Sequence, residues 1–209
     1  MTASSPHLTR DRPITRGHAA LLVIDVQNGT FSARDKTARP AFYDAAASRV
    51  IPNIRTLLAA FRAARLEVIY TVIEALTEDK RDLSLDYKLS TMGFAKGSPE
   101  AQVVAEIAPA RDEIVLAKTS SSVFNSTTLD YLLRNLGIED VFVTGFLTDQ
   151  CVDHAVKDGA DLGYYMTCVH DACAAETEAR HQAGLACFKG YCRMLDTPGM
   201  LALIKAAES

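Results

Sequence analysis

The residue with the most reactive chemistry in this sequence is Cys151, in the stretch VTGFLTDQCV. This stretch predicts the end of a buried strand at residues 140–144, a sharp turn at Gly145, and a helix that Thr148 or Asp149 can cap. Cys151 then lies in the first helical turn, where unpaired N–H groups and the helix dipole favour a negative charge. We therefore expect a lowered thiol pKa and a nucleophile. The alternative is a small buried residue, since free cysteines are commonly buried.

Two charged residues follow other buried strands. Residues 18–26 contain a continuous apolar run closed by Asp25, a pattern typical of a strand buried on both faces of a parallel sheet. Lys118 directly follows the apolar segment 113–117. Taken alone, Asp25 is equally consistent with an ordinary loop carboxylate after a strand.

The elements that must position these residues alternate between strands and helices. We expect a three-layer α/β/α fold whose six-stranded, mostly parallel sheet has the order 3-2-1-4-5-6. In such sheets ligands bind beyond the carboxyl ends of the strands, where the strand order reverses. Asp25 and Cys151 follow the two strands that flank this point. Lys118 follows strand three, roughly 10 Å away, and must reach across strand two. The three residues therefore project toward one crevice.

Composition limits the classes of function. The chain has 209 residues, of which 48% are hydrophobic and 23% charged, and its net charge is -4. We expect a flexible segment at residues 1–17 and a single domain at 18–209. The charge gives no basic field for nucleic acid, and no apolar run approaches the ~20 residues of a membrane span. Five cysteines without a CxxC pair fit neither a disulfide framework nor a zinc site, which favours a cytoplasmic protein.

Residues 74–99 form the least regular part of the sequence. A loop of this length within a compact domain usually serves a function, so we interpret it as a lid or a pocket wall. A solvated excursion with one helical turn is the alternative.

The three motifs together resemble the cysteine hydrolases of the isochorismatase-like superfamily. Members carry an Asp after the first strand, a Lys after the third, and a Cys in a segment like Gly-x-x-Thr-x-x-Cys-Val. The corresponding stretches here are VIDVQN with Asp25, VLAK with Lys118, and GFLTDQCV with Cys151. The resemblance runs from about residue 18 to the C-terminus.

The resemblance implies a catalytic triad of Asp25, Lys118 and Cys151. Asp25 accepts the thiol proton, Lys118 stabilises the charged pair, and the thiolate attacks an amide or ureide carbonyl carbon. The resemblance also implies a cis peptide bond between Leu147 and Thr148, which turns the Thr148 N–H beside the Cys151 N–H to form an oxyanion hole.

Departures from some members narrow the substrate. Nicotinamidase-like members carry metal ligands directly after the second strand. The residues at this place here, TVIEAL, contain no His, so we expect no metal and no other cofactor. Cys151 argues against a vinyl-ether substrate. The remaining branch acts on ureidoacrylate, N-carbamoyl acids, maleamate or biuret and releases ammonia. Residues that flank the triad segments or lie in the long loop are candidates for substrate binding: Asn28, Phe31, Glu74, Arg81, Tyr87 and Phe124.

Two other functions remain open. One is a vinyl-ether hydrolase of the isochorismatase type, in which Cys151 is incidental. The other is a non-enzymatic thiol-bearing binding domain on the same fold, which needs neither Asp25 nor Lys118. The resemblance also implies a homodimer or homotetramer, with a small molecule as the only other partner.

Overall fold

The computed structural model describes residues 8–207. All five strand pairings of its six-stranded sheet are parallel, and the order is β3-β2-β1-β4-β5-β6, as the sequence predicts. The strands are β1 (Ala19–Ile24), β2 (Glu67–Ile73), β3 (Ile114–Lys118), β4 (Asp140–Phe146), β5 (Tyr165–Ala174) and β6 (Arg193–Leu195).

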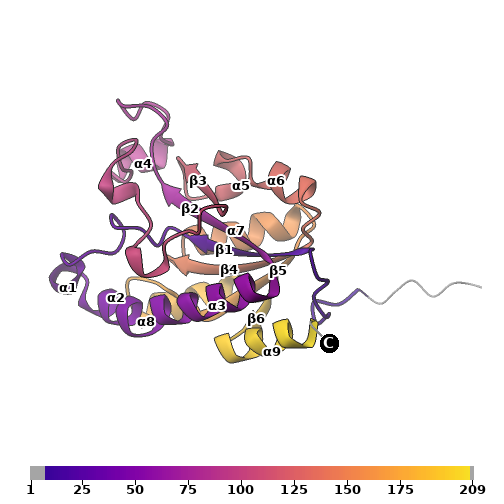
Figure 1. Cartoon of the computed structure of the whole chain (residues 1–209). Helices are drawn as coiled ribbons and strands as arrows, with labels where there is room; N and C mark the ends of the chain where they lie inside the picture. Colours follow the sequence, from indigo (N-terminus) through magenta and orange to yellow (C-terminus); the bar gives the residue numbers. More distant parts are fainter. Residues whose placement is uncertain (1–7, 208–209) are drawn as a thin grey trace, which may run out of the picture.

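Helices cover both faces of this sheet (Figure 1), which confirms the three-layer α/β/α fold. The helical elements are α1 (Asp35–Ala38), α2 (Pro40–Ala45), the π-helix η1 (Ala46–Val50), α3 (Ile51–Ala64), α4 (Leu85–Leu89), the 3-10 turns η2 (Pro99–Ala101) and η3 (Ala105–Ile107), α5 (Val123–Ser126), α6 (Leu129–Asn135), α7 (Cys151–Asp161), α8 (Glu178–Phe188) and α9 (Thr197–Ala207). No helix among residues 8–207 is long and apolar enough to cross a membrane.

The apolar run of β1 is explained by burial on both faces. Leu21 and Val23 belong to the core under α3 and α9, whereas Leu22 and Ile24 belong to the core under α6 and α7. Successive side chains of a strand point to opposite faces, so a central strand covered twice must be apolar throughout. The hydrophobic effect thus fixes the strand whose end carries Asp25.

Gly145 brings the ends of β1 and β4 close together. It pairs with Ile24 and has a φ of +111°, a conformation that favours glycine. A Cβ at this position would overlap the backbone of Ile24. The close approach therefore requires a residue without a side chain.

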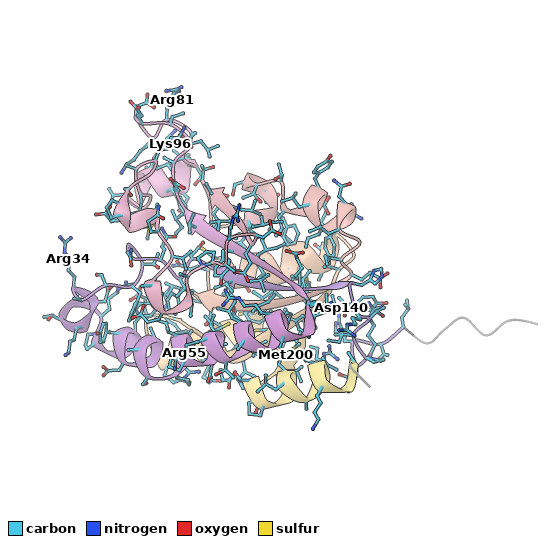
Figure 2. All side chains as sticks on the ribbon, in the orientation of Figure 1. Arg34, Arg55, Arg81, Lys96, Asp140 and Met200 are labelled. Atoms are coloured by element: carbon cyan, nitrogen blue, oxygen red, sulfur yellow. The ribbon has the colours of Figure 1, made fainter. Side chains whose placement is uncertain are left out.

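The N-terminal segment is more closely packed than the sequence suggests. The Arg12 guanidinium is 2.7 Å from both Glu139 and Asp140 and lies over the Tyr165 ring, and Ile14 is buried. Figure 2 shows Asp140 at the end of the sheet beside this segment. These contacts attach residues 12–14 to the sheet, and the flexible segment expected at residues 1–17 stays a prediction. Residues 1–7 lie outside the described residues.

Residues 99–107 do not form one continuous helix. Two 3-10 turns flank an extended stretch there, in which Val103 forms an isolated antiparallel bridge with Gln27. The Val104 N–H donates to Val26 O at 3.1 Å, so the chain that follows β1 supplies the partners that a helix would otherwise provide.

Candidate active site

Asp25, Lys118 and Cys151 meet at the carboxyl ends of the strands. Lys118 Nζ lies 2.8 Å from Asp25 Oδ2 and 3.4 Å from Cys151 Sγ. All three residues are at most 6% exposed. The crevice that the fold predicts at the reversal of strand order therefore contains a carboxylate, an ammonium and a thiol in direct contact.

Asp25 is held in a left-handed conformation directly after β1, with a φ of +56°. Asp tolerates this region better than most residues. Its N–H donates to Thr71 O at 3.1 Å, and its Oδ1 accepts from Thr71 Oγ1 at 2.7 Å. Its Oδ2 faces the Lys118 ammonium but accepts no well-aligned hydrogen bond, although it is buried. This oxygen is therefore free to accept a proton.

Lys118 is the last residue of β3 and its side chain crosses the end of β2. Its Nζ donates to Ser120 O at 2.9 Å and to Tyr87 Oη at 2.9 Å. Burial alone would lower the pKa of Lys118, but Asp25, with smaller contributions from Cys151 and Tyr87, raises it above its ordinary value. The residue is therefore a fixed cation.

Tyr87 of α4 completes the cluster. Its hydroxyl lies 3.8 Å from Cys151 Sγ, and only 4% of the residue is exposed. Burial raises the pKa of Tyr87 above its ordinary value, more than Lys118 lowers it. The sequence predicts Tyr87 as a substrate contact, whereas the structure places it against the triad itself.

The pKa of Cys151 is raised, not lowered as its place in the helix predicts. Burial is the largest cause and Asp25 the next, while Lys118 acts in the opposite direction, and the pKa of the thiol is about 11. The helix dipole cannot offset the loss of solvent around a sulfur beside a carboxylate. At neutral pH the resting residue is therefore a thiol that needs a base.

The turn before α7 differs from the expected one. Its cis peptide bond joins Phe146 to Leu147, one residue before the predicted Leu147–Thr148 bond. The Thr148 N–H donates to Ala174 O at 2.9 Å, so it is not available as the predicted oxyanion donor. Within residues 8–207, no hydrogen bond is formed by the N–H groups of Leu147 and Cys151.

The predicted cap of α7 is also wrong. Gln150 is the N-cap residue, and it forms no side-chain cap hydrogen bond. The Thr148 hydroxyl instead pairs with His181 Nδ1 at 2.7 Å, and Asp149 pairs with Arg180 at 2.6 Å. Both side chains thus fasten the turn to α8. At the start of α7, the Val152 N–H donates to Leu147 O at 3.2 Å, whereas the Cys151 N–H has no partner within residues 8–207.

A cavity of about 230 Å³ opens onto the sulfur. Asp25 and Cys151 lie at its inner end, and Met92 of the 74–99 segment forms part of its wall. The segment thus contributes Met92 to this wall, and its role as a lid or pocket wall stays a prediction. The full lining is Asp25, Gly29, Thr30, Arg39, Phe42, Ile73, Met92, Phe146, Leu147, Gln150, Cys151 and Glu176.

Comparisons with known proteins identify the family. A model of the isochorismatase domain matches residues 19–197. This chain belongs to the isochorismatase family of hydrolases. The ureidoacrylate amidohydrolase RutB of Enterobacter sp. (strain 638) is 34% identical over 183 residues, which cover 80% of this chain and 76% of that protein.

Solved structures of other proteins share the fold of this isochorismatase-family chain. A cysteine hydrolase from Pseudomonas syringae pv. phaseolicola superposes with a TM-score of 0.83 at 24% identity, over 98% of this chain and all (100%) of that one. N-carbamoylsarcosine amidase from Thermoplasma acidophilum superposes with a TM-score of 0.69 at 25% identity, over 86% of this chain and 96% of that one.

Arg39 and Glu176 are charged residues of the cavity that the sequence analysis missed. Arg39 pairs with Glu176 at 2.9 Å and with Asp35 at 2.7 Å, and it donates to Thr30 O at 2.6 Å. Burial lowers the pKa of Arg39, but its two carboxylate partners raise it overall. Arg39 lies fourteen residues after Asp25, in a stretch whose polar character predicts only a loop.

Three polar residues predicted to bind substrate lie outside the cavity. Asn28 donates to Pro99 O at 3.0 Å, and Glu74 accepts from the Gly97 N–H at 2.6 Å. Arg81 pairs with Asp79 on the surface. Figure 2 shows Arg81 at the outer end of the segment that carries α4, pointing away from the sheet.

The two phenylalanines predicted as pocket walls pack elsewhere. Phe31 stacks on Tyr43 with ring centroids 5.1 Å apart. Phe124 stacks on Tyr164 at 5.9 Å and belongs to the core under α7. Neither ring lines the cavity. Within residues 8–207, no group of three or more His, Cys, Asp or Glu side chains is arranged to hold a metal ion.

Proposed function

We propose that this isochorismatase-family chain is a cysteine amidohydrolase, which cleaves the C–N bond of a small amide or ureide through a Cys151 thioester and releases ammonia. The carrying observation is the position of Lys118 Nζ, 2.8 Å from Asp25 Oδ2 and 3.4 Å from Cys151 Sγ. Similarity to ureidoacrylate amidohydrolase and to N-carbamoylsarcosine amidase supports the same class of reaction.

The first step transfers the Cys151 proton to Asp25 as the sulfur attacks the carbonyl carbon. A thiol with a pKa of about 11 needs such a base at neutral pH. Lys118 contacts both the carboxylate and the sulfur, so its charge stabilises the thiolate before attack. The unoccupied N–H groups of Leu147 and Cys151 are the candidates for binding the oxyanion.

The second step breaks the C–N bond. The protonated Asp25 gives its proton to the departing nitrogen, which leaves as ammonia, and the acyl group remains on Cys151 as a thioester. Asp25 then takes a proton from water, whose oxygen attacks the thioester carbon. Release of the acid returns this proton to the sulfur, so the net change is one water consumed and one ammonia formed.

The cavity favours a small anionic substrate. Its volume of about 230 Å³ suits a molecule smaller than a typical drug. Arg39 provides a guanidinium that can bind a substrate carboxylate once that carboxylate takes the place of Glu176, its partner at 2.9 Å. In this proposal Arg39 binds the substrate anion, and Arg81, which pairs with Asp79 on the surface, does not.

A screen for ammonia release tests the proposal. The substrates are ureidoacrylate, N-carbamoyl amino acids, maleamate, biuret and nicotinamide. With the substrate that reacts, Cys151→Ala and Cys151→Ser should both be nearly inactive, because Ala has no nucleophile and the Ser hydroxyl gives up its proton far less readily than a thiol. Cys187→Ala is the matched control, since Cys187 is exposed on α8 and should keep full activity.

The acyl-enzyme provides a second measurement. Rapid quenching should show a Cys151 peptide heavier by the mass of the acyl group. Substantial turnover by Cys151→Ala would rule out the covalent route. Turnover of isochorismate together with no ammonia from any amide would favour the vinyl-ether reaction instead.

A further inference from the structure

Lys118 and Tyr87 converge on the sulfur of Cys151 from two different parts of the chain. Lys118 comes from the end of β3, and Tyr87 from α4 in the segment between β2 and β3. Lys118 Nζ is 3.4 Å from the sulfur and Tyr87 Oη is 3.8 Å from it. The proposed mechanism assigns no role to the Tyr87 hydroxyl.

The direction of the Tyr87 proton follows from its partners. Lys118 is a donor only, and it donates to Tyr87 Oη at 2.9 Å. The hydroxyl proton of Tyr87 therefore points away from Lys118, and Cys151 Sγ is the acceptor within reach. A thiolate accepts such a bond more strongly than a thiol does, because charge-assisted hydrogen bonds are stronger.

We infer that Tyr87 is a catalytic residue that donates a hydrogen bond to the Cys151 thiolate and stabilises it before attack. The inference rests on the proposed role of Cys151 as the nucleophile. The distance of 3.8 Å is long for this bond, and hydrogen bonds of a resting active site often tighten only when charge develops.

Packing holds the hydroxyl in place. Ser84 accepts the Tyr87 N–H with its side chain at 3.2 Å, and its own N–H donates to Thr119 O at 2.9 Å. The Tyr87 ring packs in a small core with Ile73 and Leu83. The helix α4 is thus attached to the strand ends that carry the triad, and the Tyr87 hydroxyl does not depend on substrate for its position.

The groups that face the Cys151 sulfur shift its pKa in opposite directions. Burial and then Asp25 raise the pKa of Cys151, and Lys118 and Tyr87 lower it. Tyr87 keeps its own proton, because burial raises its pKa. Removing its hydroxyl should therefore reduce the thiolate fraction at every pH below 11 without changing the charge of the site.

Alkylation of Cys151 by iodoacetamide tests the inference without any substrate. The rate is measured between pH 7 and 9 from the Cys151 peptide by mass spectrometry. Tyr87→Phe should react about tenfold more slowly at each pH, as expected for loss of one hydrogen bond to a charged group. With the substrate identified by the ammonia screen, kcat should fall by about the same factor and KM should change little.

Two further variants distinguish the effect of the Tyr87 hydroxyl from the effect of the position of α4. Tyr131→Phe removes a hydroxyl from the exposed surface of α6 and should leave the alkylation rate unchanged. Ser84→Ala removes the cap of α4 but keeps the Tyr87 hydroxyl, so it should lower Tm with a smaller effect on the rate.

An unchanged or faster alkylation of Tyr87→Phe would overturn the inference, since Tyr87 would then only fill space. Equal slowing by Ser84→Ala and Tyr87→Phe would do the same, because it would show an effect of helix position. Turnover by Cys151→Ala would instead contradict the proposed function, while the alkylation result would stand by itself.

Discussion

The two ends of the cavity hold ion pairs of nearly equal length in different surroundings. At the inner end, Asp25 and Lys118 are 2.8 Å apart with side chains 1% and 0% exposed. At the outer end, Arg39 and Glu176 are 2.9 Å apart with side chains 27% and 28% exposed. A buried charge depends on its partner, whereas solvent reaches each charge of a partly exposed pair. Only the outer pair can exchange a partner for a substrate at low cost.

Breaking the inner pair should have the largest effect. Lys118→Met leaves the Asp25 carboxylate buried without compensation, so we expect a loss of about 3 kcal/mol or more in the free energy of unfolding. Activity should fall by at least about 100-fold, because the thiolate loses its cation. Urea unfolding and the ammonia assay measure the two effects.

A double variant separates stability from catalysis. Asp25→Asn combined with Lys118→Met removes both charges, and Asn tolerates the left-handed conformation of this position. Stability should recover in large part, while activity should remain absent. A double variant as unstable as Lys118→Met would show that the buried charge is not the cause.

Breaking the outer pair should change substrate binding more than stability. Arg39→Gln should raise KM for an anionic amide by about 10- to 100-fold, since a charge-assisted hydrogen bond is lost. The cost in stability should be smaller than that of Lys118→Met, because Arg39 and Glu176 are both partly exposed. The control is Arg81→Gln, which lies on the surface with Asp79 and should leave KM unchanged.

Glu176→Gln, at the same outer end of the cavity, should not raise KM as Arg39→Gln does. It removes a competitor for Arg39, so KM for an anionic amide should stay equal or fall. A rise in KM would instead indicate that Glu176 itself holds the ureido group. With a neutral amide of the same size, Arg39→Gln should leave KM unchanged.

The smallest effect concerns His181, which supports the turn before Cys151. Burial lowers the pKa of His181 below its ordinary value near 6.5. Because the unfolded chain takes the proton first, the contribution of His181 to stability is complete above pH 6.5 and declines as pH falls through that value. The decline cannot exceed about 1.4 kcal/mol per pH unit for one proton.

Urea unfolding between pH 7.5 and 5 measures this contribution. His181→Gln should show a weaker dependence of stability on pH in this range. His154→Gln is the control, because His154 is exposed on α7 and should keep the dependence of the unaltered protein. Equal curves for all three proteins would argue against a buried neutral His181.

The sequence pattern predicts those features of this molecule that depend on residues close together in the chain, such as its strands and helices. The apolar run of β1 and the alternation of elements indicate a parallel sheet with helices on both faces, whereas the assignment of Asp25, Lys118 and Cys151 to one site comes from the resemblance to a family. The pKa of Cys151 was predicted in the wrong direction, because helix position is visible in a sequence and burial beside a carboxylate is not.

The outer end of the cavity shows where such prediction stops. Arg39 and Glu176 are 137 positions apart, and each follows a segment without a motif. Tertiary packing brings them together, because η1, which continues the chain after α2, packs on β5, and Glu176 lies just after that strand. Phe31 and Phe124 were expected at the pocket because of their neighbours in sequence, but each ring has a nearer apolar partner.

The missing side chain of Gly145 has a consequence for the chemistry. This residue sets the separation of two chain segments, one leading into the base and the other into the nucleophile. A methyl group there would act as a wedge and move the carboxylate and the sulfur apart, although it touches neither. A protein altered in this way can keep its core and still lose proton transfer, because the transfer is sensitive to changes of a few tenths of an ångström in the distance between donor and acceptor.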